Sequence, residues 1–202
     1  FMPMAEQIGL AIDLGLLALE QTARELAAWQ RALAVDPPIF SCVNISSRQL
    51  LRHDLLREIK SALMRNDVMK GSLKLELTES LIMENPEFSA QLLHHLRELG
   101  AGLVLEDFGA GYSSLSYLQR FPFDTVKIDR SLIKPNGKAT RPIILRSTIA
   151  LAHDLGMDVV AEGAETESDV IELYQLGCGY AQGHAFGRPI SSQEARRLVG
   201  AA

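Results

Sequence analysis

The apolar positions of the chain change their spacing repeatedly between the periods of a helix and of a strand. Side chains such as Ile8 and Ile12 recur at helical spacing in residues 4–33, whereas residues 72–80 alternate polar and apolar over their middle. These patterns predict helices over residues 4–33, 47–66, 85–100, 112–120, 141–156, 166–177 and 191–200. They predict strands over residues 39–46, 72–80, 101–108, 124–129, 157–163 and within 179–187.

Strands and helices thus alternate along the chain with short connections, which predicts an α/β fold built on a parallel sheet. The predicted strands also end in polar side chains, which are Asn44, Glu76, Glu79, Glu106, Asp107, Lys127, Asp129, Glu162, Glu165 and Gln182. All strand ends meet at one face of a closed barrel, but they spread along an edge in an open doubly wound sheet. The polar strand ends therefore favour a (β/α)8 TIM-like barrel.

Composition and charge narrow the classes of function. Hydrophobic residues make up 47% of the 202-residue chain, enough for a core without metals or disulfides. The formal charge of −5 argues against binding a DNA or RNA polymer through its phosphates, but does not exclude a small anionic ligand. The sequence has no apolar run long enough to predict a membrane span. Cys42 and Cys178 lie far apart, and we expect free thiols in a reducing cytosol.

The acidic strand ends have the chemistry of a metal site. Their carboxylate and amide oxygens are hard ligands that suit Mg²⁺ or Mn²⁺, and the absence of His and Cys from the set argues against zinc. Two such ions can clamp a phosphodiester and activate water, while Lys127 would steady the water or the phosphate. The residues therefore predict metal-dependent phosphodiester hydrolysis. Glu106 and Asp107 would point to opposite faces of a regular strand, so they can share a site only if the strand is ending.

Individually, these residues also have ordinary structural explanations. Asp129 precedes Arg130-Ser131 and could serve only as a helix cap. Glu79 and Glu165 could be surface charges or could fasten a loop, and Gln182 alone carries little weight. Their joint position at successive strand ends is what favours a functional site.

Seven ordered motifs cover nearly the whole chain. They are FMPMAEQIGL, VNIS, LELTES, EDFGAGYSSLSYL, VKIDRS, VVAEGAET and AQGHAFGRP. In this order they resemble the EAL domain of bacterial cyclic di-GMP signalling. The resemblance implies a (β/α)8-like barrel and a phosphodiesterase that uses Mg²⁺ or Mn²⁺ to linearise cyclic di-GMP to 5′-pGpG.

The resemblance also implies a role for each matching residue. The implied metal ligands are Asn44, Glu76, Glu106, Asp107 and Glu162. Glu106 would bridge two ions and Asp107 would bind one, while Glu162 would also belong to the catalytic set. Lys127 would position the attacking water, and Asp129 would support that site. Glu79 would anchor the loop after EDFG, and Gln182 would contact a guanine.

The sequence departs from the family pattern in two important places. Where the family has DDFG this chain has EDFG, so Glu106 carries its charge one methylene further out, about 1.5 Å of bond length. The Glu-Ala-Leu signature that names the family lies upstream of FMPMAE and does not occur in this sequence. We therefore expect residues 1–202 to be a single EAL-like domain from a longer protein, truncated or only partly resolved at its N-terminal strand.

Two main functions stay open on this evidence. The first is an active cyclic di-GMP phosphodiesterase, and the alternative is a catalytically weak EAL-like cyclic di-GMP receptor. A module that binds no nucleotide and acts through protein contacts is the least favoured. The resemblance further implies a cytoplasmic bacterial protein that forms a homodimer and is attached to other signalling domains.

Overall fold

The computed structural model describes residues 2–33, 35–108, 119–133, 141–198 and 200. The strands are β1 (Ser41–Asn44), β2 (Leu73–Thr78), β3 (Gly102–Phe108), β4 (Thr125–Ile128), β5 (Asp158–Glu162) and β6 (Tyr180–Gln182). The helices are α1 (Met2–Gln7), α2 (Ala11–Ala32), α3 (Ser47–Leu50), α4 (Leu55–Asn66), α5 (Glu79–Met83), α6 (Pro86–Glu98), α8 (Arg130–Ile133), α9 (Arg141–Asp154), α10 (Glu167–Gln175) and α11 (Ser192–Leu198).

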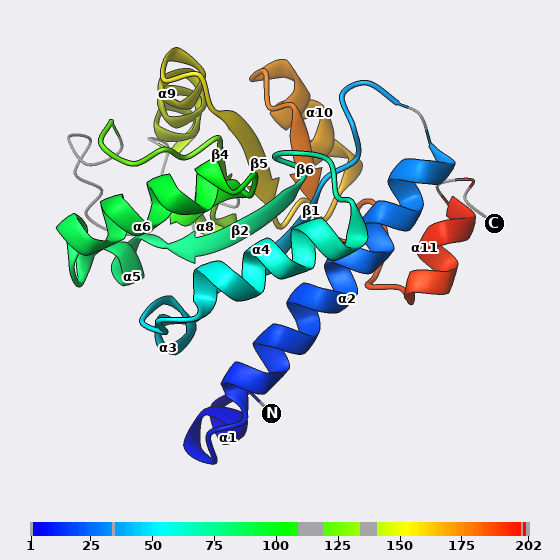
Figure 1. Ribbon diagram of the computed structural model, residues 1–202. Coiled ribbons are helices and arrows are strands. Elements are labelled where there is room, and N and C mark those ends of the chain that lie inside the picture. Colours follow the sequence, from blue (N-terminus) through cyan, green and yellow to red (C-terminus); the bar gives the residue numbers. More distant parts are fainter. Residues whose placement is uncertain (1, 34, 109–118, 134–140, 199, 201–202) are drawn as a thin grey trace. The chain divides into compact units, whose positions relative to one another are not determined.

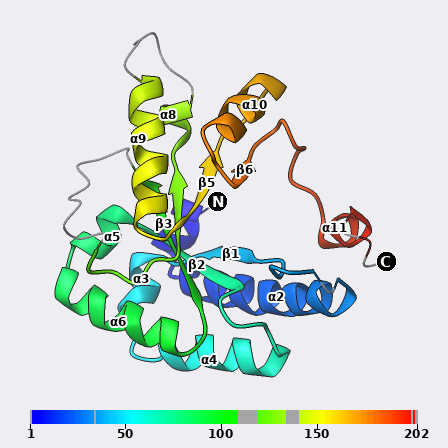
Figure 2. The same ribbon diagram turned by 90° about the horizontal axis from the view of Figure 1, so that it is seen from above.

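The strands form one six-stranded sheet in the order β1-β2-β3-β4-β5-β6. Pairing is parallel between β1 and β2 and from β3 through to β6. Figure 1 labels the other strands, and β3 is labelled in Figure 2. Parallel neighbours need a crossover connection, and among the described residues helices lie between β1 and β2, β2 and β3, β4 and β5, and β5 and β6. The predicted parallel α/β fold is therefore confirmed. Most of the predicted helix over 112–120 lies outside the described residues.

The chain divides into two compact units, which are described separately. The first unit comprises Phe1–Leu77, Asn85–Leu103 and Ile190–Ala202. In it, α2 packs against α4 and β1, and Figure 2 shows α2 and α4 side by side. Leu26 of α2 and Ile59 of α4 are fully buried, which accounts for the apolar stripes of both helices.

A buried amide fixes α2 to the start of the neighbouring strands. The Nε2 of Gln30 donates to the carbonyl of Ile39 at 2.9 Å and to the hydroxyl of Ser72 at 2.7 Å. Its Oε1 accepts from the backbone N–H of Met69 at 3.1 Å. Burial of a polar group is tolerated when its hydrogen bonds are made, so Gln30 holds one orientation of α2.

The second unit comprises Thr78–Glu84 and Val104–Pro189. In it, α9 packs against α8 and β5. Val126 and Ile128 of β4 are fully buried, as is Ala161 of β5, so these strands form the core of the unit. Thr166 and Asp169 form a capping box at the start of α10 (Glu167–Gln175).

Two predicted helices are broken in the structure. The helix predicted over residues 4–33 divides into α1 and α2 near Gly9, whose φ of 81° lies in the left-handed region that favours glycine. The helix predicted over 47–66 divides into α3 and α4. Ser46 caps α3, since its side chain accepts from the N–H of Gln49.

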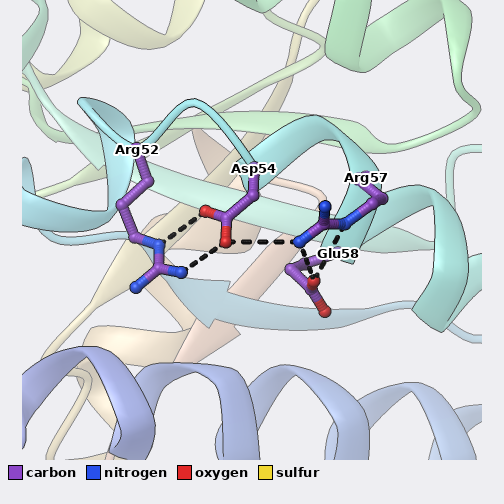
Figure 3. Close-up of polar contacts among 4 residues, drawn as sticks. All are labelled: Arg52, Asp54, Arg57 and Glu58. Atoms are coloured by element: carbon purple, nitrogen blue, oxygen red, sulfur yellow. Dashed lines mark hydrogen bonds and ion pairs between the residues drawn. The ribbon is translucent and has the colours of Figure 1, made fainter.

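Charged side chains occupy the break between α3 and α4 (Figure 3). Arg52 contacts both carboxylate oxygens of Asp54, one of them at 2.6 Å from its Nε, and Arg57 lies 3.4 Å from the same carboxylate. Arg57 also pairs with Glu58 at 3.2 Å. The hydrogen bond from Arg52 lowers the pKa of Asp54 to about 2. The spacing of apolar residues does not reveal this break, which contains a polar contact between Arg52 and Asp54.

No helix within the described ranges combines the length and the apolar character needed to cross a membrane. Both cysteines are free thiols, as predicted. Cys178 is buried and Cys42 is half-buried, and burial raises the pKa of the Cys178 thiol.

Candidate active site

The carboxyl end of β3 is irregular. Leu105 is paired with Val126 of β4, and Phe108 is paired with Ile128. Between these two pairs, β3 has two residues whereas β4 has only one. This two-against-one arrangement is a β-bulge, a feature that often redirects side chains next to functional sites.

The two bulged residues are Glu106 and Asp107, and the residue opposite them is Lys127. Asp107 has a φ of 59°, in the left-handed region that few residues other than glycine adopt. Glu106 is half-buried and Asp107 is exposed. The alternation of faces predicts that Glu106 and Asp107 share a site only if the strand ends at this pair. In the structure the strand continues to Phe108. The bulge instead interrupts the alternation of faces and places both residues opposite Lys127 in the register.

Lys127 is a buried cation between two strand ends. Its Nζ lies 2.5 Å from Oε1 of Glu162 on β5 and 3.8 Å from Oε1 of Glu106 on β3, and its side chain is only 7% exposed. An ammonium group is costly to bury unless carboxylates compensate its charge. The structure therefore brings together three predicted site residues, Glu106, Lys127 and Glu162, in the second unit.

Two further predicted site residues lie together in the first unit. Asn44 at the end of β1 is the register partner of Glu76 on β2. Asn44 is exposed, whereas Glu76 is 4% exposed. Leu75 and Leu77 beside Glu76 are fully buried, so both faces of β2 are covered, as expected for a central parallel strand.

Asp129 caps a helix, which was one of the two roles that the sequence allowed for it. Its Oδ1 accepts from the backbone N–H of Ser131 at 2.8 Å, at the start of α8. The hydrogen bond from Ser131 lowers the pKa of Asp129, against an opposing contribution from partial burial. This capping role is compatible with a second role at the site, because Asp129 lies two positions after Lys127 on the same strand end.

The remaining predicted residues occupy different places. Gln182 ends β6 as the register partner of Glu162 and is exposed. Glu79 begins α5, where Thr78 is the cap, and is half-buried. The loop that Glu79 was predicted to anchor includes residues 109–118, which lie outside the described residues.

A cavity of about 620 Å³ opens beside Glu162 and Gln182 in the second unit. Its wall also includes side chains that sequence reasoning did not select, namely Arg130, His184, Phe186 and Arg188. This volume is within the usual range for small-molecule sites. The motif AQGHAFGRP contains His184, Phe186 and Arg188 as well as Gln182. This motif is therefore the sequence feature that could have identified these three residues.

The donor chemistry around Lys127 fits a divalent cation. Glu106, Asp107 and Glu162 supply hard carboxylate oxygens, and their formal charges outnumber the single ammonium group. Within the described ranges, no three His, Cys, Asp or Glu side chains are arranged as a ready-made metal site. Metal coordination therefore stays a prediction that rests on the donor set.

Solved structures resemble this chain closely. One described as the PaMucR phosphodiesterase in complex with c-di-GMP is 34% identical, with a TM-score of 0.89 over 96% of this chain and 78% of that one. The EAL enzyme Bd1971, in a form bound to cAMP and cyclic di-GMP, is 28% identical, with a TM-score of 0.88 over 98% of this chain and 55% of that one. These matches confirm the predicted fold class, an incomplete TIM-like barrel.

Sequence comparisons agree with the structural ones. An uncharacterized protein of Azorhizobium caulinodans is 39% identical over 98% of this chain and 27% of its own length. The bifunctional diguanylate cyclase/cyclic di-GMP phosphodiesterase MucR of Pseudomonas aeruginosa is 35% identical over 96% of this chain and 28% of its own length. The chain thus spans little more than a quarter of these two relatives. The EAL domain model matches residues 1–189, and the chain belongs to the EAL domain family.

Proposed function

We propose that this domain hydrolyses cyclic di-GMP to 5′-pGpG in a reaction that depends on Mg²⁺ or Mn²⁺. The observation that carries the proposal is the buried ammonium of Lys127, placed between Glu106 and Glu162 and opposite the bulge that presents Asp107. The likeness to a phosphodiesterase whose structure contains c-di-GMP supports the choice of substrate.

The metal ligands in this proposal are Asn44 on β1, Glu76 on β2, Glu106 and Asp107 on β3, and Glu162 on β5. When bound, the ions would neutralise the phosphodiester and lower the pKa of the attacking water. The carboxylates hold the ions, and an acidic site of this kind would otherwise repel an anionic substrate. Glu79 is proposed to anchor the adjacent loop.

The catalytic residues in this proposal are Lys127, Asp129 and Glu162. The ammonium of Lys127 can hold the attacking water or a phosphate oxygen through its three N–H donors. Glu162 fixes the position of that ammonium at 2.5 Å, so the two groups act together. Asp129 begins α8 and steadies the strand end that carries Lys127. Gln182, in the wall of the cavity, would contact a guanine of the substrate.

A catalytically weak cyclic di-GMP receptor is the second candidate. The observation that favours it is Glu106, which stands where the family has Asp and carries its carboxylate one methylene further from the backbone. A bridging ligand displaced by even part of that length could keep nucleotide binding while slowing the chemical step, because reaction rates depend steeply on geometry.

Turnover distinguishes the two candidates. Cyclic di-GMP is incubated with Mg²⁺ or Mn²⁺ and with a form of the domain that includes an upstream Glu-Ala-Leu strand, and 5′-pGpG is followed by chromatography. Formation of 5′-pGpG that stops with excess EDTA supports the phosphodiesterase. Nucleotide binding that is equally tight in EDTA, without turnover, supports the receptor. Absence of both binding and turnover refutes both candidates.

The setting of the domain is also a proposal. Its relatives are three to four times longer, so we propose that the parent protein joins it to other signalling domains. We further propose a homodimer in the bacterial cytoplasm. Sedimentation of the protein at several concentrations tests the dimer, and a monomer at every concentration would contradict it.

A further inference from the structure

Arg130 lies across a glycine at the end of β5. A methyl group placed on Gly163 would come within 2.6 Å of Cγ, 2.8 Å of Cβ and 2.9 Å of Cδ of Arg130. The aliphatic stem of Arg130 therefore fills the space that a side chain at Gly163 would need. Gly163 also has a φ of 83°, so glycine suits the position for two independent reasons.

The guanidinium of Arg130 is held at its far end by Glu165. Nη2 of Arg130 lies 2.5 Å from Oε1 of Glu165, and the two side chains are 59% and 32% exposed. Exposed ion pairs contribute little, typically about 0–1 kcal/mol. We therefore assign the larger effect to the stem on Gly163 and a smaller one to the ion pair.

The backbone beneath Arg130 carries a candidate catalytic residue. Glu162 precedes Gly163 directly and is the 2.5 Å partner of Lys127. The N–H groups of Gly163 and Ala164 both donate to the carbonyl of Gln182, at 2.7 Å and 3.1 Å. The stem of Arg130 covers one side of this turn at Gly163, and we expect it to keep out water that would compete for the same hydrogen bonds.

We propose that Arg130 is a positioning residue, whose stem fixes the end of β5 and thereby holds Glu162 where it can bind metal and orient Lys127. This inference rests on the proposed function for its metal but not for its contact with Gly163. It also predicts that loss of Arg130 weakens metal binding, whereas simple electrostatics predicts the opposite change. Removing a cation near a metal site should tighten cation binding, whereas losing the positioning should weaken it.

Two variants separate the stem from the charge. Arg130→Met keeps an unbranched apolar stem and lacks the guanidinium, while Arg130→Ala lacks both. Glu165→Gln removes the ion pair alone, and Arg146→Ala on α9, exposed outside the cavity wall, is the matched control for losing a surface arginine. Binding of Mn²⁺ to the 202-residue chain is measured by the electron paramagnetic resonance of the free ion. Amide hydrogen exchange at Gly163 and Ala164 is measured without metal.

We expect Arg130→Ala to weaken Mn²⁺ binding about ten-fold, the low end of the effect of supporting residues at metal sites. The Mn²⁺ affinities of Arg130→Met and Glu165→Gln should stay within about three-fold of the parent, because both variants keep an unbranched side chain at position 130 over Gly163. Exchange at Gly163 and Ala164 should accelerate only in Arg130→Ala.

Several results would overturn the inference. Equal Mn²⁺ affinities of the Ala and Met variants would show that the stem does not matter, and tighter binding in both would show that Arg130 acts only through charge. Unchanged amide exchange in Arg130→Ala would refute the shielding of the turn. If the parent binds neither Mn²⁺ nor cyclic di-GMP, the proposed function fails instead, and the exchange experiment still decides the contact with Gly163.

Discussion

Replacing Asp107 by glycine or by alanine tests the bulge that organises the candidate site. Asp107 is exposed and has a φ of 59°, so neither substitution removes buried surface and both act mainly through the backbone. We expect the glycine variant to be the more stable of the two. This is the reverse of the usual order within a strand, where glycine is the weaker residue.

The magnitude follows from two opposing effects. A residue with a Cβ in the left-handed region costs about 1–2 kcal/mol. Glycine avoids that cost but loses about 0.5–1 kcal/mol more than alanine in conformational entropy on folding. The Gly variant should therefore exceed the Ala variant by roughly 0.5–1 kcal/mol, or about 1–4 °C in Tm for a chain of this size.

Urea titration of both variants measures the difference, and Asp158 provides a matched control. Asp158 is also an exposed aspartate, but it lies at the regular start of β5. There Ala should exceed Gly by about 0.5–1 kcal/mol. If Ala is also the more stable residue at position 107, the left-handed backbone and the bulge built on it are wrong. Hydrolysis should be low in both Asp107 variants if this carboxylate binds metal.

Three further predictions concern other charged groups. In a form of the domain that includes an upstream Glu-Ala-Leu strand, Glu106→Asp should keep or raise hydrolysis, whereas Glu106→Gln should lower it by orders of magnitude. Equal turnover of Glu106→Gln and the parent by chromatography would show that Glu106 is not a bridge. Lys127→Met should lower the free energy of unfolding by about 1–3 kcal/mol in urea titration. This loss is smaller than for a fully buried pair because the carboxylate partners are 20% and 28% exposed, and an unchanged midpoint would contradict the buried ion pair. The pKa of Asp54 falls from 3.8 to about 2 on folding, so its stabilising contribution is present above pH 3.8 and is lost as the pH falls to 2. The stability difference between the parent and Asp54→Asn should therefore shrink over that range, and a constant difference would refute this contribution.

Strand ends were the part of the site that the sequence could predict. Lys127 and Glu162 end successive strands, and parallel pairing in register brings such ends together. This prediction succeeded because parallel pairing in register carries the ends of adjacent strands to the same edge of the sheet.

Contacts that break a period could not be predicted in this way. The bulge at Glu106 and Asp107 contains no glycine, so local sequence gave no sign that the alternation would stop there. The break between α3 and α4 coincides with the pairing of Arg52 with Asp54, a polar contact that hydrophobic periodicity does not detect. Arg130 meets its partners only after the chain has completed another helix and strand, and its role emerges from the packing on Gly163.

The most direct test of the account is the position of Mn²⁺ in crystals of the protein soaked with this ion and cyclic di-GMP. Anomalous scattering locates the ion independently of the protein density. The account predicts Mn²⁺ within about 2.5 Å of carboxylate oxygens of Glu106, Asp107 and Glu162, with the ammonium of Lys127 beside the phosphodiester. Nucleotide bound at full occupancy with no Mn²⁺ at these three carboxylates would contradict it.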